Sequence, residues 1–186
     1  MEARMPFHNR LVAAVLAVFA LAWPVFADDA ALDKLFDELK TSDAQASGRI
    51  EQEIWNEWSK SGSPAMDLLL ERGRKAMAEG DLPAAIEHLT ALTDHAPDFA
   101  EGWNARATAY YQMGELGPAV QDIAHVLTLN PRHFGALAGL GMIFEQLDQP
   151  KKALEVYKAA LAIHPHLSGV LDSVQRLEAE AAGQDL

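Results

Sequence analysis

The chain has 186 residues, of which 49 % are hydrophobic, so it is long enough to fold around one core or as one short repeat array. Its formal net charge of −12 disfavours a nucleic-acid partner, because phosphate binding needs a basic face. The chain contains no cysteine, which excludes disulfides, thiolate nucleophiles, cysteine metal ligands and lipid attachment through cysteine.

Residues 1–27 have the layout of a secretory signal peptide. A short basic start precedes an uninterrupted apolar run, Leu11–Trp23, and Val25 and Ala27 fit the small-residue rule for cleavage after Ala27. The alternative is an uncleaved N-terminal anchor, although the run is shorter than the roughly 20 residues that span a membrane. We expect export to a bacterial periplasm, with no membrane insertion once the signal is removed.

Residues 28–63 show two amphipathic helical patterns. The first has a stripe made by Leu32, Leu35, Phe36 and Leu39, and the second has a stripe made by Ile50, Ile54 and Trp58, with Trp55 beside it. Glu51 falls where the later repeats place a small alanine, so we expect an irregular helical hairpin rather than a leading repeat. The turn-rich stretch SKSGSP, residues 59–64, joins this hairpin to the rest of the chain.

A period of 34 residues organises the chain from residue 66 to 167. Equivalent positions in the three units are Pro97, Pro131 and Pro165; Ala85, Ala119 and Ala153; and the small residues Gly73, Ala107 and Gly141. A fixed period of this length indicates a repeat array. The three units are residues 66–99, 100–133 and 134–167.

Each unit is predicted to contain two helices. Gly80, Gly114 and Asp148 interrupt the units near their middle, and a proline follows within a few residues, where it suits the first turn of a new helix. The expected helix pairs are residues 65–79 with 82–95, 99–113 with 116–129, and 133–147 with 150–163. Residues 168–186 are expected to form a helix that covers the last repeat, followed by a short tail.

The units resemble tetratricopeptide repeats, whose pattern is W-x2-L-G-x2-Y, then A-x3-F, then P. The second unit matches with Trp103, Ala107, Tyr110, Ala119, Ile123 and Pro131, and the third with Leu137, Leu140, Gly141, Phe144, Ala153, Tyr157 and Pro165. The first unit is weaker, since Ala76 stands where an aromatic residue is expected. The resemblance implies an all-α fold: a right-handed α-solenoid of three helix pairs, with the N-terminal hairpin before it and a C-terminal capping helix after it.

Two faces of the helix predicted at residues 99–113 have different expected roles. Trp103, Ala107 and Tyr110 are spaced i, i+4, i+7, so they share one face, which we expect to pack in the core. Arg106 is expected to pair with Asp122 on the partner helix, as the resemblance implies. The equivalent residues of the third unit are both apolar, which indicates that these two positions touch.

The neighbouring face is the candidate binding site. The resemblance implies that the first helix of each unit lines a concave groove, and the groove residues predicted here are Arg74, Met77, Glu101, Asn104, Thr108, Tyr111, Gln112 and Met142. Methionine adapts to varied apolar partners, and an amide such as that of Asn104 can bond a peptide backbone, so this face suits a polypeptide segment. The alternative is a solvated face without a partner.

Some members of the family clamp a C-terminal carboxylate with lysines and asparagines in this groove. Arg74 and Asn104 match that pattern in part, whereas Ala138 and Met142 offer no cation in the third unit. We therefore do not expect recognition of chaperone tails of that kind.

No motif predicts catalysis, a metal or a cofactor. The candidate histidines His88, His95, His125, His133, His164 and His166 have no H-E-x-x-H spacing, and we expect them at the surface or at helix caps. No Ser–His–Asp order or glycine-rich phosphate loop stands out, so we predict that the protein is not an enzyme.

The function predicted from the sequence is that of an exported scaffold. It would bind a protein or peptide in its concave groove and act as an adaptor or assembly factor in the cell envelope. The alternative is a structural or self-associating envelope protein, in which exposed Trp55 and Trp58 of the hairpin join protomers. These two indoles could instead dock onto the first repeat.

Overall fold

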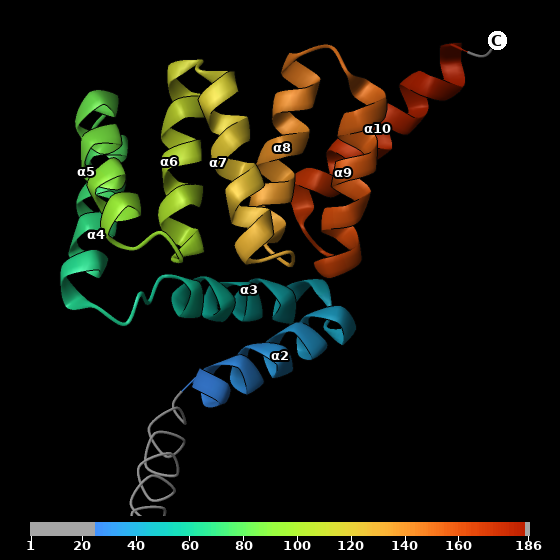
Figure 1. Ribbon diagram of the computed structural model, residues 1–186. Helices are drawn as coiled ribbons and strands as arrows, with labels where there is room; N and C mark the ends of the chain where they lie inside the picture. The colour runs from blue at the N-terminus through green and yellow to red at the C-terminus, as the bar shows by residue number, and fades with distance from the viewer. Residues whose placement is uncertain (1–24, 185–186) are drawn as a thin grey trace, which may run out of the picture.

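The computed structural model describes residues 25–184, and this part of the chain is all-α, with nine helices and no strand (Figure 1). Most of the expected signal peptide therefore lies outside the described residues, and helix α2 begins at Val25. Within residues 25–184, no helix combines the length and the apolar character that a membrane crossing requires.

Six helices form three antiparallel pairs that stand side by side (Figure 1). The pairs are α4 (Pro64–Ala78) with α5 (Leu82–His95), α6 (Ala100–Met113) with α7 (Leu116–Leu129), and α8 (Phe134–Gln146) with α9 (Pro150–Ile163). Each bound lies within one residue of that expected from the 34-residue period. The repeat array predicted from the sequence is therefore confirmed.

The turn inside each pair has the same backbone conformation at the same repeat position. Gly80 and Gly114 both have φ of 79°, in the left-handed region where a side chain is unfavourable. Asp148 occupies this position in the third pair with φ of 54°, and aspartate is among the few other residues that tolerate it. Proline at the start of α5 and of α9 then fits the first turn of the returning helix.

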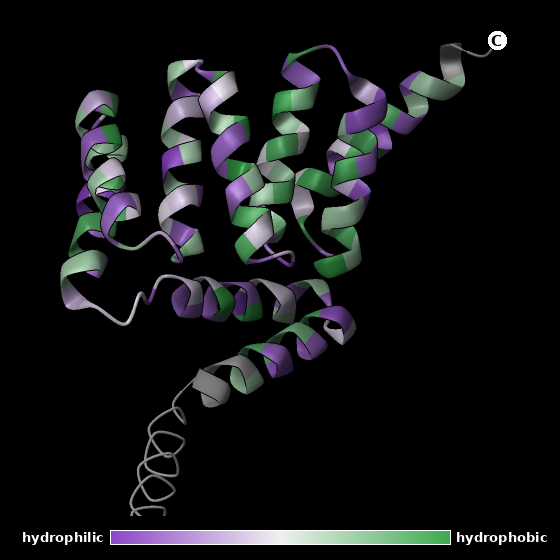
Figure 2. Cartoon of the chain, viewed as in Figure 1, coloured by the Kyte–Doolittle hydropathy of each residue, from purple (hydrophilic) through white to green (hydrophobic). Residues whose placement is uncertain are grey.

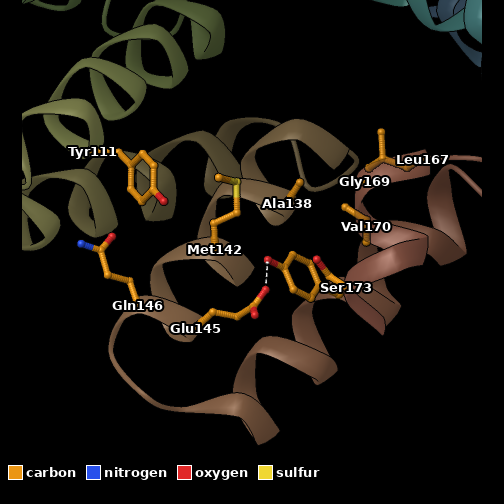
Figure 3. A pocket seen from close by; sticks show the side chains of 10 residues that line it. Tyr111, Ala138, Met142, Glu145, Gln146, Leu167, Gly169, Val170 and Ser173 are labelled. Carbon is orange, nitrogen blue, oxygen red and sulfur yellow. Dashed lines mark hydrogen bonds between the residues drawn. The ribbon is translucent and has the colours of Figure 1, made fainter. Parts of the chain in front are cut away.

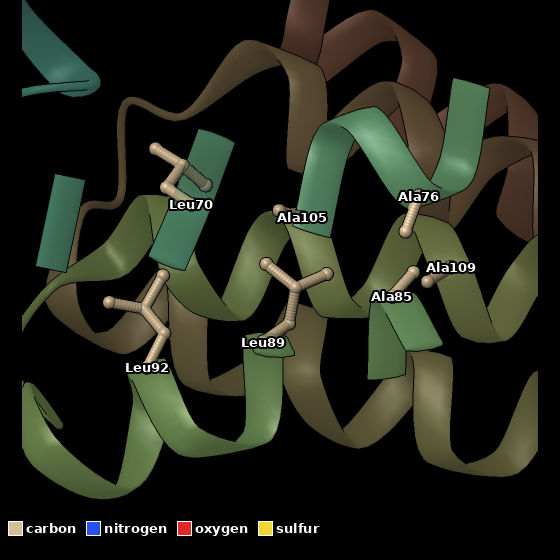
Figure 4. Packing of buried hydrophobic residues seen from close by; sticks show 7 residues of the cluster. All are labelled: Leu70, Ala76, Ala85, Leu89, Leu92, Ala105 and Ala109. Atoms are coloured by element: carbon tan, nitrogen blue, oxygen red, sulfur yellow. The ribbon is translucent and has the colours of Figure 1, made fainter. Parts of the chain in front are cut away.

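Small residues let the two helices of a pair approach closely. In the first repeat, an added Cβ at Gly73 would lie 2.5 Å from Cγ of Leu89, so glycine leaves the space that the leucine fills. Figure 4 shows the cluster that results between α4, α5 and α6. Its buried members are Leu70, Ala76, Ala85, Leu89, Leu92, Ala105 and Ala109.

Helix α10 (Ser168–Gln184) covers the exposed end of the last pair. Val170, Val174 and Leu177 are buried against Ala153 and Tyr157 of α9. These residues recur at i, i+4, i+7, so they form one apolar stripe while the opposite face stays in water. The capping helix expected from the sequence is confirmed.

The N-terminal hairpin consists of α2 (Val25–Thr41) and α3 (Ala44–Trp58). It does not stack on the first repeat as another unit, because α3 lies crosswise beneath the lower ends of the upright helices of the array (Figure 1). Asp43 caps α3 by accepting a hydrogen bond from the backbone N–H of Ala46 at 2.8 Å. In Figure 2 the two hairpin helices alternate green and purple turns, as expected for helices with one packed and one exposed face.

The hairpin packs mainly on the third repeat. Trp58 is 9 % exposed, Trp55 is half-buried, and both indoles lie against Phe134 at the start of α8, with ring centroids 5.0 and 5.6 Å away. The expectation that these tryptophans are exposed, or that they dock onto the first repeat, is therefore wrong. Residues far apart in sequence meet here, which no local pattern reveals.

Candidate functional site

The face predicted to pack does so. Ala107 is buried, and Trp103 and Tyr110 are half-buried against the core of the second repeat. The indole of Trp103 lies at the rim of this core, where its Nε1–H donates to the carbonyl of Pro97 at 2.8 Å and its ring lies 4.1 Å from that of His125. This aromatic face is therefore structural and offers no open platform.

Arg106 forms the predicted ion pair with Asp122. Its Nε–H and an Nη–H donate to the two carboxylate oxygens at 2.8 and 2.9 Å, which is the bidentate geometry. A further N–H donates to the hydroxyl of Thr93 on α5 at 2.8 Å, so one side chain ties three helices together. The hydrogen bond to Asp122 raises the pKa of Arg106 above its ordinary value.

Five of the eight predicted groove residues line one hollow. It has a volume of about 340 Å³; four of these five residues come from α6, and Met142 comes from α8. The four from α6 are Asn104, Thr108, Tyr111 and Gln112. These side chains share a hollow because their spacing puts them on the concave side of the first helices, next to the packed stripe.

A second hollow of about 630 Å³ continues the first between α8 and α10. Tyr111, Ala138 and Met142 line both, so the two hollows form one continuous surface, which we call the groove. Figure 3 shows Met142 between Tyr111 on one side and Val170 and Ser173 of α10 on the other. The contribution of α10 was not predicted, since the sequence indicated only a capping role for this helix.

Small residues make the floor of the groove. Ala138 and Gly139 lie on α8, and Gly169 begins the wall on α10, where an added Cβ would meet nothing within 4 Å. Met142 rises from this floor and is 46 % exposed. A flexible thioether above a shallow floor can adjust to differently shaped apolar side chains.

Glu101 is not an open groove residue, contrary to the prediction. It is 3 % exposed, and its carboxylate accepts hydrogen bonds from Arg74 of α4, from Asn104 at 3.2 Å and from His133 at 3.0 Å. A buried carboxylate needs such partners to offset lost hydration. Arg74 is therefore held by this carboxylate and by the hydroxyl of Ser59, rather than free for a partner.

His133 is a helix cap, as expected, but it is fully buried. Its Nδ1 accepts a hydrogen bond from the N–H of Ala136 at 3.0 Å, so the proton of the neutral ring lies on Nε2, which donates to Glu101. Its ring stacks on that of Trp58 at 4.2 Å. Of the two expected places, the surface or a helix cap, the structure shows the cap, and the ring is buried because Trp58 of α3 covers it at this end of the array.

The same end buries a second histidine. His164 has no exposed surface, and its Nε2–H donates to the carboxylate of Glu51 on α3 at 3.1 Å. This hydrogen bond lowers the pKa of Glu51 below its ordinary value. His164 is the C-cap residue of α9, so of the two expected places, the surface or a helix cap, the structure shows the cap. Glu51 holds α3 to the array, which explains why it stands where a repeat would have alanine.

Met77, the remaining predicted residue, lines neither hollow. It is half-buried against the first repeat's cluster. The predicted site is thus divided: five residues line the groove, Arg74 pairs with buried Glu101, and Met77 lies at the edge of the core of the first repeat. Across residues 25–184, no group of three or more histidine, aspartate or glutamate side chains is placed to hold a metal ion.

The charge of the groove comes from Glu145. Among the described residues that line the two hollows it is the one carboxylate, and none is lysine, arginine or histidine. Its oxygens accept from the hydroxyl of Tyr157 at 2.8 Å, drawn as a dashed line in Figure 3, and from Arg176. Burial, with the help of this hydrogen bond, raises the pKa of Tyr157.

Comparisons with known proteins agree with this architecture. A family model described as tetratricopeptide repeat matches residues 70–124 and 105–168. A TPR repeat-containing protein of Rhizobium etli is 37 % identical over 153 residues, which cover 82 % of this chain and 75 % of the relative. Human sperm-associated antigen 1 is 34 % identical over 110 residues, but these cover only 12 % of its length.

Solved structures show the same fold at lower identity. The first TPR of Spaghetti (RPAP3), bound to the HSP90 peptide SRMEEVD, is 22 % identical with a TM-score of 0.61, covering 64 % of this chain and 95 % of that one. MamA is 20 % identical with a TM-score of 0.60, covering 80 % and 85 % of the two chains. The period, the helix pairs and these matches lead to one conclusion: the chain belongs to the tetratricopeptide repeat family.

Proposed function

We propose that the protein is an exported scaffold that binds a protein or peptide partner in its groove and serves as an adaptor or assembly factor in the cell envelope. The observation that carries the proposal is the continuous groove itself. Rigid helices α6, α8 and α10 present an exposed methionine, a tyrosine and hydrogen-bonding side chains to the same space. That combination suits an extended or helical polypeptide, whose side chains need apolar contacts and whose backbone needs polar ones.

The structural neighbours support a polypeptide occupant. One was solved with an HSP90 peptide, and another, the TPR2B domain of yeast Sti1, in a complex with pHsp70. Both share the fold with this chain, and we propose the same class of partner, a polypeptide, for this protein.

The proposed scaffold is not catalytic. Acid–base catalysis needs a titratable group that is free to exchange protons with a substrate. Glu145, the carboxylate that lines the groove, is hydrogen-bonded to Tyr157 and paired with Arg176. Its role in the proposal is to fix α8, α9 and α10 relative to one another.

Export is proposed from the sequence of residues 1–27. The test is mass spectrometry of the protein purified from cell fractions of its source. We expect a mature N-terminus at Asp28 in the periplasmic fraction. Recovery of the whole chain from the cytoplasmic fraction would contradict export, and recovery of the whole chain from membranes would favour the anchor.

Binding in the groove is tested by photocrosslinking in cells. A benzophenone side chain is placed at Gln112 or Met142 in the groove, and at Gln121 or Lys158 on the outer helices α7 and α9 as matched exposed controls. We expect an adduct from the groove positions only, and its loss when Tyr111→Ala is added. Equal adducts from groove and control positions would exclude the groove as the binding surface.

A further inference from the structure

We infer that the groove takes a non-acidic segment of a partner chain that carries apolar side chains, whether internal or terminal, and rejects acidic tails that are held by their free carboxylate. This inference rests on the proposed function and specifies the chemistry of its partner. It is argued from the charges that surround the groove, from the donors available in it and from the shape of its floor.

The groove itself carries little charge. The described lining residues carry one formal charge, the negative charge of Glu145, and no cation faces the two hollows. The chain as a whole has a formal net charge of −12. Since Arg176 pairs with Glu145, the groove offers an acidic segment no uncompensated positive charge, and the negative field of the whole chain opposes such a segment while it attracts a basic one.

Three arginines, one each on α4, α6 and α10, are already paired with carboxylates. Arg74 is bonded to buried Glu101, so it cannot turn to a ligand without taking the guanidinium partner from that buried carboxylate. Arg176 is paired with Glu145 and with Glu180, 3.5 Å away. Arg106 faces Asp122 on the other side of α6. Each of these three guanidinium groups already faces a carboxylate, so an incoming carboxylate would have to compete for it.

The side-chain amides at the groove are poorly suited to hold a terminal carboxylate. The amide of Asn104, which matched a carboxylate clamp in the sequence, donates to Glu101 instead. The remaining amides in the groove, those of Gln112 and Gln146, are neutral and exposed. A neutral amide can pair with a peptide backbone, but it cannot offset the loss of hydration of a terminal carboxylate beside Glu145.

The groove has an open shape with small residues along it. The floor at Ala138 and Gly139 and the wall at Gly169 leave room for apolar side chains of a partner close to the helix backbones, and Met142 can move to accommodate them. The 630 Å³ hollow between α8 and α10 is open along the groove, so the occupant can continue past it. A segment within a chain fits such a trough as well as a terminus does.

The inference is tested with display libraries of random twelve-residue peptides panned on the purified protein. One library presents each peptide between two fused domains, and the other presents it with a free C-terminus. We expect enriched peptides with apolar residues and a net charge of zero or above in both formats. Replacing the basic residues of an enriched peptide by glutamate should weaken its Kd at least tenfold, and amidation should leave it unchanged.

A charge variant assigns the selectivity to the groove. Gln112→Lys with Gln146→Lys adds two cations at exposed groove positions, whereas Gln121→Lys with Thr128→Lys adds the same charge at exposed positions of the outer helix α7. The groove variant should weaken binding of a basic peptide more than the control variant does. The acidic peptide SRMEEVD serves as the negative probe, for which we expect no binding to the unmodified protein.

The possible outcomes separate this inference from the function on which it rests. Enrichment of acidic peptides that need a free carboxylate would overturn the selectivity and leave the peptide-binding function standing. The same conclusion would follow if the two charge variants changed the Kd of a peptide that crosslinks to Met142 by the same factor. Failure of both libraries to enrich any peptide would contradict the binding function itself, and the selectivity with it.

Discussion

Two glycines on α8 provide a test of how tightly the scaffold beneath the groove is packed. Gly141 faces Tyr157 of α9, and a Cβ added there would lie 2.2 Å from the tyrosine Cε1. The ring is 1 % exposed, so it has little room to move. Gly139, on the same helix, faces Ile123, and its added Cβ would lie 3.7 Å from Cδ1, an ordinary contact distance.

The two alanine substitutions should therefore have opposite signs. Gly139→Ala gains helix propensity of about 1 kcal/mol, which raises Tm by about 2–4 °C in a chain of this size. Gly141→Ala gains the same propensity but forces the tyrosine ring aside at about 1–3 kcal/mol, so the net cost is up to about 2 kcal/mol and Tm falls by up to about 8 °C. Circular dichroism or calorimetry at neutral pH measures both. If Gly141→Ala raised Tm as much as Gly139→Ala, the close packing of α8 on α9 would be refuted.

Three further predictions concern the buried charges. Asp122→Ala should lower the free energy of unfolding by about 3 kcal/mol, because it leaves Arg106 unpaired, and the double variant Arg106→Leu with Asp122→Val should be more stable than either single change, measured by urea unfolding. Glu101→Ala should cost about 3–5 kcal/mol in the same assay, since three donors lose their acceptor, and a loss below about 1 kcal/mol would show that the carboxylate is not the centre of this network. The hydrogen bond from His164 lowers the pKa of Glu51 below its ordinary value of 4.5, so the unfolded chain binds the proton more readily and the stability from this pair is lost as pH falls through the lowered pKa. The Tm difference between the protein and Glu51→Gln should thus shrink on acidification below pH 4.5, and a constant difference would contradict the assignment.

The repeat array could be predicted from sequence because its determinants recur or act locally. The 34-residue period gave the helix pairs, and the repeat position shared by Gly80 and Asp148 gave the turns within them. Helical spacing assigned Ala107 to the packed face of its helix and Thr108 to the groove face. The pair of Arg106 and Asp122 could be predicted because its two residues face each other within one repeat, where the third repeat has two apolar residues instead.

The remaining features depend on contacts that have no period. Glu101 appeared to be a groove residue because its repeat position lies on the groove side, but α3 covers that end of the array and buries it beside His133. Trp55 and Glu51 contact the start of α8 and the end of α9, segments separated from them by most of the repeat array. Such long-range docking is set by shape and charge in three dimensions, and a single sequence does not encode it in a local pattern.

Methyl NMR tests the central claim that a polypeptide partner occupies the groove most directly. Met142 and Met113 are almost equally exposed, at 46 % and 45 %, but only Met142 lines the groove. When the crosslinked partner segment or a selected peptide is titrated into protein labelled with 13C at the methionine methyl groups, the resonance of Met142 should shift or broaden while that of Met113 stays in place. A saturating ligand that moves Met113 and leaves Met142 unchanged would contradict the account.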